Sequence, residues 1–217
     1  PFYGSTTHKN GKDVMRSIPR GSEYFNRTND IAAALTKDKE LYQIYCHDFH
    51  TSDQWMDIRC EETIFEQCHM SGSNFKRGKF TDVLFRNSDI SNAKFHQNYF
   101  ANCCFEGVRC TGTIFSGSIF RYVQFTNCIL EYSNMSSVQF TDVNFSGCML
   151  DNAILSQCKH KNMLFHECSL RGTSFFHTSL KKVDLTSCEL EDLALSDEAH
   201  ELRGAIVNIS QATELAR

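Results

Sequence analysis

The sequence predicts an all-β solenoid, in which one short unit is repeated to build successive coils. Every fifth residue from Trp55 to Leu195 is large and mostly apolar, which makes 29 consecutive positions, 14 of them Phe and 8 Leu. A helix repeats every 3.6 residues and a strand every two, so neither one gives a strict period of five. The residue two positions before each of these centres is usually small, and Gly, Asn or Asp commonly follows, as tight turns require.

The five-residue units are clearest in segments 91–95, 141–145 and 171–175, each of which ends in Phe. We expect the small residue and the large centre to point inward and the polar pair to turn the chain. This pattern resembles the pentapeptide-repeat family over residues 53–197. The resemblance implies a right-handed quadrilateral β-helix with four units in each coil. The repeat region then forms about seven coils, a rod of about 35 Å at the usual strand spacing.

Composition restricts the class of protein. The 217 residues carry 26 acidic and 22 basic side chains, and the net charge of −4 argues against nucleic acid as a direct ligand. No long apolar run occurs, so no membrane span is predicted, and we expect a bacterial cytoplasmic location, with secretion into a host cell as the alternative. Seven of the 11 cysteines fill the small inward position, where reduced and buried thiols are expected: Cys68, Cys103, Cys128, Cys148, Cys158, Cys168 and Cys188.

Residues 1–52 carry no five-residue frame and are predicted to form an N-terminal arm and a capping helix. Residues 1–27 are polar and read as an extended arm. A helix is expected from Asp30, with an apolar stripe that covers the first coil. The alternative is a separate docking or secretion-linked segment. The stripe consists of Ile31, Ala34, Leu35, Leu41 and Ile44.

Residues 198–217 follow the last unit and are predicted to form a short strand-helix tail. The run 205–207 is β-prone, and Ser210 can cap a terminal helix. The segment resembles the C-terminal tail of the quinolone-resistance, topoisomerase-protecting branch of the family. That resemblance implies a cap on the last coil or a homodimer contact. The candidate residues are Leu202, Ile206, Val207, Ala212 and Leu215.

No catalytic motif is present, so the chain is predicted not to be an enzyme and to need no cofactor or metal. There is no Gly-rich phosphate loop and no His-Glu-x-x-His pair. His160 takes the place of an apolar centre, and we expect it to be hydrogen-bonded within the core rather than to act as a ligand.

Candidate binding residues lie at outward positions. Ile64, Leu84 and Cys104 fall in one column, which predicts an apolar strip covered either by the N-terminal helix or by a protein partner. Acidic residues share a corner column that Arg171 interrupts, and others gather at the C-terminal end. The acidic candidates are Glu131, Asp151, Glu191 and Asp192.

Two classes of function remain after these exclusions. The first is a non-catalytic protein–protein interaction module of bacterial origin, with the repeat domain of a secreted effector as one form of it. The second is implied by the family resemblance: a DNA mimic that binds DNA gyrase or topoisomerase IV and protects it from inhibitors. Mimicry of duplex DNA needs a dense negative charge, which a net charge of −4 supports poorly.

Overall fold

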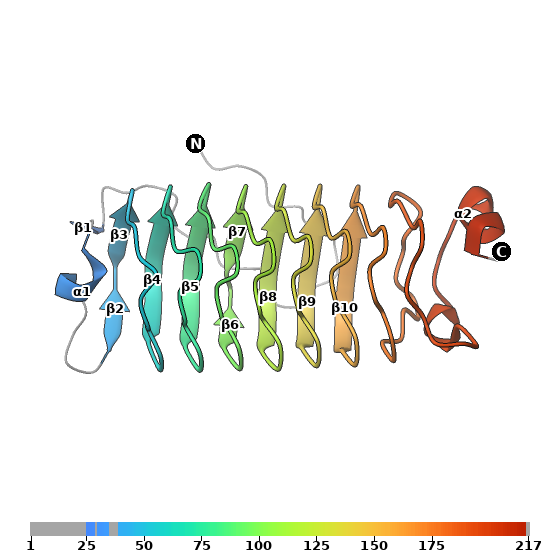
Figure 1. Ribbon diagram of the computed structural model, residues 1–217, viewed down its shortest axis with the longest axis horizontal. Helices are drawn as coiled ribbons and strands as arrows, with labels where there is room; N and C mark the ends of the chain where they lie inside the picture. The colour runs from blue at the N-terminus through green and yellow to red at the C-terminus, as the bar shows by residue number, and fades with distance from the viewer. Residues whose placement is uncertain (1–24, 29, 35–38, 216–217) are drawn as a thin grey trace, which may run out of the picture.

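The chain folds into a rod of stacked parallel strands, seen side by side along the long axis in a computed structural model (Figure 1). The structure describes residues 25–28, 30–34 and 39–215. Within these described residues, two short helices and a 3₁₀ turn, His200–Leu202, lie towards the ends. The remaining elements are β1 (Asn26–Thr28), α1 (Ile31–Ala34), β2 (Glu40–Tyr42), β3 (Ile44–His47), β4 (Arg59–Glu66), β5 (Lys79–Arg86), β6 (Tyr99–Ala101), β7 (Cys104–Glu106), β8 (Ile119–Thr126), β9 (Gln139–Ser146), β10 (Lys159–His166) and α2 (Ile209–Leu215).

The strands pair in a register that steps by 20 residues, so equivalent centres stack from coil to coil. Phe80, Phe100, Phe120 and Phe140 form one such column. The long strands cover two sides of each coil, and single parallel bridges link the other two sides. The predicted β-solenoid of about seven turns, built from four units in each coil, is confirmed.

Corners are made by the residue two positions after each centre. In almost every unit this residue has a positive φ, as in Asn127 (52°) and Gly107 (61°). Such a backbone favours Gly and Asn, which explains the turn residues of the repeat. At Gly107 a Cβ atom would stand 2.7 Å from the side-chain oxygen of Asn87 on the preceding coil, so a larger residue there would have to displace that side chain.

Stacked phenylalanine rings fill the interior. One column runs through six coils with ring centroids 4.6–5.1 Å apart and planes within 15° of parallel. Rings of different columns meet edge to face, as Phe100 and Phe115 do, which is a favoured aromatic geometry. The stacked column contains Phe65, Phe85, Phe105, Phe125, Phe145 and Phe165, all of them buried.

The parallel ladder begins earlier than the five-residue frame does. Strands β2 and β3 pair with β4 at a spacing of 19 residues, as in Leu41 beside Cys60. The spacing is 20 from Gln54 to the bridge between Ser174 and Ala194, and Asp184 then bridges Ile206 at a spacing of 22. The expectation that Leu41 and Ile44 belong to a helix is therefore wrong, because both lie in strands. The first coil is one residue shorter than the 20-residue coils that follow, so it does not fit the strict five-residue frame of the sequence.

The N-terminal cap is short. Helix α1 covers only four residues, and its Ile31 is buried against the main core, with Ala34 packed on the same core. Leu35 lies outside the described residues. No helix in the described parts of the chain is long and apolar enough to cross a membrane.

The C-terminal tail continues the ladder for part of a coil and then turns into α2. The backbone N–H groups of Lys182 and Leu185 donate to the carbonyls of Gly204 and Ile206. Ile206 forms a single bridge rather than the predicted short strand. Helix α2 begins at Ile209 and is capped by Asn208 instead of Ser210, because the Asn208 side-chain oxygen accepts from the Gln211 N–H at 2.9 Å.

Candidate protein-interaction surfaces

The interior of the rod leaves no room for a substrate. Inward centres from Phe75 to Leu185 are buried in one continuous core, apart from the partly buried His160. The Nε2 atom of His160 lies 2.5 Å from the carbonyl oxygen of Ser179, so this ring is hydrogen-bonded as expected, although at the edge of the core. Function must therefore be sought on the outside, where the packing leaves surface pockets at the two ends of the rod.

The predicted apolar strip is covered by this chain itself. Ile64 and Leu84 are each 1% exposed, and with Cys104 they form a cluster of their own, here called the covered column. Phe25 and Tyr45 pack against it. The covered column is therefore not available to a partner, and it is closed by Phe25 and β3 rather than by the helix α1.

A polar chain runs beside the covered column. The Tyr45 hydroxyl donates to the Glu66 carboxylate, and Arg86 lies between Glu66 (3.2 Å) and Glu106 (3.3 Å). Burial and the hydrogen bond to Glu66 raise the pKa of Tyr45 to about 12. Burial alone would raise the pKa of Glu66, but Tyr45 and Arg86 lower it. These acidic groups are thus tied to partners on neighbouring coils.

An exposed apolar and acidic surface occupies one corner of two adjoining coils. Met149 stacks beside Ile129 on one side of the rod, and Ile154 stacks beside Asn134 on the next. The N–H of Tyr132, at the corner, donates to the carbonyl of Asp151 at 3.0 Å, which places Tyr132 next to these residues. We call this surface the corner patch: Ile129, Glu131, Tyr132, Met149, Asp151 and Ile154.

The apolar members of the corner patch are unusually exposed. Tyr132 is 62% exposed, Met149 44% and Ile154 39%. Glu131 and Asp151, two acidic candidates from the sequence, are partly exposed beside them. Exposed apolar groups rimmed by charge are typical of protein-binding sites.

The other acidic candidates lie further towards the C-terminus. Arg171 contacts the carboxylates of Glu189 (2.9 Å) and Glu191 (3.5 Å). Asp192 is exposed at the next corner, with a positive φ of 55°. Because Arg171 separates this group from Asp151, the four acidic candidates do not form one continuous negative surface.

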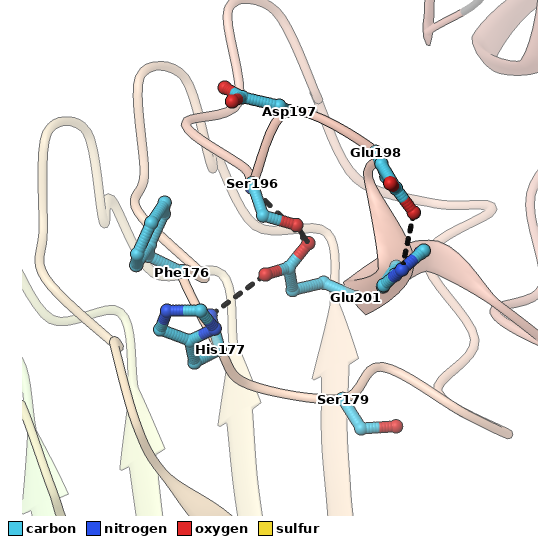
Figure 2. Close-up of a pocket in the computed structure, with 8 residues that line it drawn as sticks. Phe176, His177, Ser179, Ser196, Asp197, Glu198 and Glu201 are labelled. Atoms are coloured by element: carbon cyan, nitrogen blue, oxygen red, sulfur yellow. Dashed lines mark hydrogen bonds and ion pairs between the residues drawn. The ribbon is translucent and has the colours of Figure 1, made fainter.

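The C-terminal end holds a pocket of about 540 Å³ (Figure 2). Glu201 lies in its wall and is buried. Its carboxylate accepts from the His177 N–H at 2.8 Å and from the Ser196 hydroxyl at 2.8 Å. Burial would raise the pKa of Glu201, but backbone N–H donors, including its own and that of His177, and the Ser196 hydroxyl lower it to about 2.

Helix α2 supplies hydrogen-bond donors to the last backbone carbonyls of the rod. The side-chain amide of Gln211 is buried and donates to the carbonyls of Leu185 (2.8 Å) and Cys188 (2.7 Å). Three of the five apolar tail residues named above, Leu202, Val207 and Leu215, pack against the core of this chain. Ile206 and Ala212 are exposed.

The described surfaces of the rod carry no exposed thiol. All 11 cysteines are free and buried. Burial raises the pKa of Cys60 and Cys110, which makes these two thiols poor nucleophiles, whereas a hydrogen bond with Cys46 lowers the pKa of Cys68, a thiol inside the rod. In the C-terminal pocket the closest acid–base pair is His200 and Glu198, 2.6 Å apart and exposed. Neither group adjoins a nucleophilic thiol.

A filled β-solenoid with binding groups only on its outside defines a class of rod-shaped repeat proteins. Within that class, this chain belongs to the pentapeptide-repeat family. The family model described as "Pentapeptide repeat region" matches residues 78–153 and 118–195, and that described as "Pentapeptide repeats (8 copies)" matches residues 56–92. No curated protein matches the chain.

Solved structures of similar fold include other proteins of this type. A trypsin-treated variant of QnrB1, a plasmid-mediated fluoroquinolone resistance protein, is 20% identical, with a TM-score of 0.46, and the match covers 84% of this chain and 89% of that one. HetL, a pentapeptide repeat protein involved in heterocyst differentiation regulation in the cyanobacterium Nostoc, is 13% identical, with a TM-score of 0.38 and coverage of 82% and 93%. The two family matches, both to pentapeptide repeats, support a repeat protein of the interaction type.

Several residues of these surfaces escaped the sequence prediction. Tyr132 occupies a corner where Gly or Asn is usual, and this departure from the pattern could have identified it. Glu201 and Gln211 lie beyond the frame, and nothing in the sequence places their side chains on the last coil.

Proposed function

We propose that this chain is a non-catalytic protein-interaction module that binds its partner through the corner patch. The observation that carries the proposal is the exposure of Tyr132, Met149 and Ile154 at one corner of a rod whose interior is otherwise filled. The parallel ladder fixes the backbone that carries these side chains, so binding requires no ordering of a loop.

The side chains of the corner patch indicate the kind of partner that it would bind. Tyr132, Met149 and Ile154 suit an apolar surface, since Tyr and Met are enriched at interfaces. Glu131 and Asp151 suit Lys or Arg side chains around it. We therefore infer a protein partner with an apolar centre and a basic rim.

Site-specific crosslinking tests the proposal. A photoreactive amino acid at position 132 should crosslink to one defined protein in bacterial lysate, and Met149→Lys on the same chain should abolish that product. A photoreactive group at position 164 is the matched control, because Leu164 is exposed and apolar but lies on another side of the rod. Equal crosslinking from positions 132 and 164, or a product that survives Met149→Lys, would contradict the proposal.

A type II topoisomerase is the alternative partner. The structure offers limited support for mimicry of DNA, because arginines separate the acidic groups, as Arg86 and Arg171 do. A DNA gyrase supercoiling assay with a quinolone tests it directly. If the chain neither protects nor inhibits gyrase, the topoisomerase alternative is lost, and the interaction module remains to be tested by crosslinking.

A further inference from the structure

We propose that Asp48, His50 and His69 form a binding site for a divalent transition-metal ion of the zinc type. Their ligand atoms all lie within 4.8 Å of one another, and the three side chains are exposed. Among the residues that the structure describes, this is the one group of at least three potential ligands with such spacing. The site lies outside the corner patch and is independent of the proposed partner.

Two adjoining coils bring these residues together. His50 and His69 are paired across a parallel bridge, and their rings stack with centroids 4.5 Å apart and planes 20° apart. The His69 N–H donates to the Phe49 carbonyl at 2.6 Å, and the Thr51 N–H donates to the His69 carbonyl at 2.9 Å. The backbone on both sides of the histidine pair is therefore fixed.

Asp48 completes the group from the same coil as His50. Because Phe49 between them points into the core, Asp48 and His50 both lie on the outside. The Asp48 carboxylate is 3.4 Å from the Nε2 atom of His50. Ligand atoms of a tetrahedral zinc ion stand about 3.3 Å apart, given zinc–ligand distances of about 2.0–2.1 Å. Rotation of exposed side chains can bring the His69 nitrogen to the same distance.

The donor set determines the class of ion. Imidazole nitrogen suits zinc, copper and nickel, whereas magnesium and calcium prefer oxygen ligands alone. Two histidines and one carboxylate leave a fourth tetrahedral position open to water or to a group from another molecule. The ion would also join the 19-residue first coil to the next coil, so binding should stabilise the N-terminal end.

Titration of the intact, reduced chain with Zn²⁺ in a calorimeter tests the site. We expect one ion per chain, and a loss of affinity of at least about tenfold in His50→Ala and in His69→Ala. Asp48→Asn should weaken binding less, because the amide oxygen remains a weak ligand. His166→Ala is the matched control, since His166 is an exposed histidine that has a single carboxylate neighbour, Glu167 at 3.7 Å.

Two further readouts separate this site from others. Zn²⁺ should raise the melting temperature of the unmodified chain but not that of the His50→Ala/His69→Ala double variant. Co²⁺ should give a visible spectrum of nitrogen and oxygen ligation. The proposal is overturned if no saturable binding occurs, if the histidine variants bind as the unmodified chain does, or if Co²⁺ shows a thiolate charge-transfer band. Circular dichroism confirms that each variant is folded.

Discussion

The two ends of the rod are closed in different ways. At the N-terminal end, apolar side chains complete the first coils: Phe25 and Tyr45 pack on the covered column, and α1 packs on the main core. At the C-terminal end, Leu202, Val207 and Leu215 also pack on the core, and two buried polar side chains, Glu201 and Gln211, bind backbone groups that the last coil leaves unpaired.

The difference reflects what a solenoid end exposes. The last coil presents both an apolar ring and unpaired backbone N–H and C=O groups, and each needs cover. Apolar burial is insensitive to pH, whereas a buried carboxylate is not. The two ends should therefore respond differently to truncation of an apolar side chain. Both should lose stability in acid, because Glu66 beside the covered column also has a lowered pKa, and Glu201 should account for the loss at the C-terminal end.

The largest effect is expected at the covered column. Leu84→Ala should lower the free energy of unfolding by about 3–4 kcal/mol, because it leaves a cavity in a packed site. Leu164→Ala is the matched control in the same outward column, where the side chain is exposed, and should change stability by no more than about 0.5 kcal/mol. Urea unfolding measures both, and equal values would contradict a covered column.

Glu201→Gln should come next, with a loss of about 2 kcal/mol at neutral pH. The variant removes a charged acceptor and turns an amide NH₂ towards groups that are themselves donors. Because the pKa of Glu201 in the folded chain is about 2, below its usual 4.5, its contribution to stability is fully present above pH 4.5. The contribution is lost as the pH falls towards 2.

The pH dependence isolates the contribution of Glu201 at the C-terminal end. Between pH 4.5 and 2, the unmodified chain and Leu84→Ala should both lose stability through Glu201, while Glu201→Gln should lose less. The urea midpoint of unfolding, measured for the unmodified chain and both variants across this pH range, tests whether the loss of stability follows this direction. A variant Glu201→Gln that follows the unmodified chain throughout would show that Glu201 does not close the C-terminal end.

The sequence predicted the rod far better than its ends. A period of five forces Phe and Leu into stacked columns, so the coil number and the corner positions followed from the pattern. The first coil was not predicted, because one of its sides is one residue shorter than the sides of the later coils. The difference moves Leu41 and Cys46 out of the five-residue frame. The role of Gln211 was missed because a polar side chain on a two-turn helix gives no periodic signal.

The candidate surfaces were predicted in part. The outward column of Ile64 and Leu84 was identified from spacing alone, but its cover depends on Phe25, which has no place in the repeat. The proximity of His50 and His69 is also hidden in the sequence, since their 19-residue spacing differs from the 20-residue coil. The cover by Phe25 and the proximity of His50 and His69 were not predicted, because both lie where the chain departs from its regular five-residue period.

Gln211→Ala should have a smaller effect than Glu201→Gln, about 1–2 kcal/mol. Two neutral hydrogen bonds to the carbonyls of Leu185 and Cys188 are lost, and water can reach part of the site once α2 frays. Hydrogen exchange provides the measurement: protection should fall in the last coil and remain unchanged at β4 and β5. Loss of protection along the whole rod would show that the C-terminal cap is not a local unit.

The smallest effect on stability is expected at Ile209, which is 88% exposed at the start of α2. If Glu201 and Gln211 already close the C-terminal end, Ile209→Lys should change the free energy of unfolding by less than about 0.5 kcal/mol. The homodimer contact, which the family resemblance implies as the alternative to a cap, gives the same variant a second measurement. Near Ile206 and Ala212, a lysine should weaken self-association, which sedimentation measures at several protein concentrations. A large loss of stability in Ile209→Lys at concentrations where the chain is monomeric would contradict this account, since it would show that the C-terminal end also depends on an apolar contact of Ile209 itself.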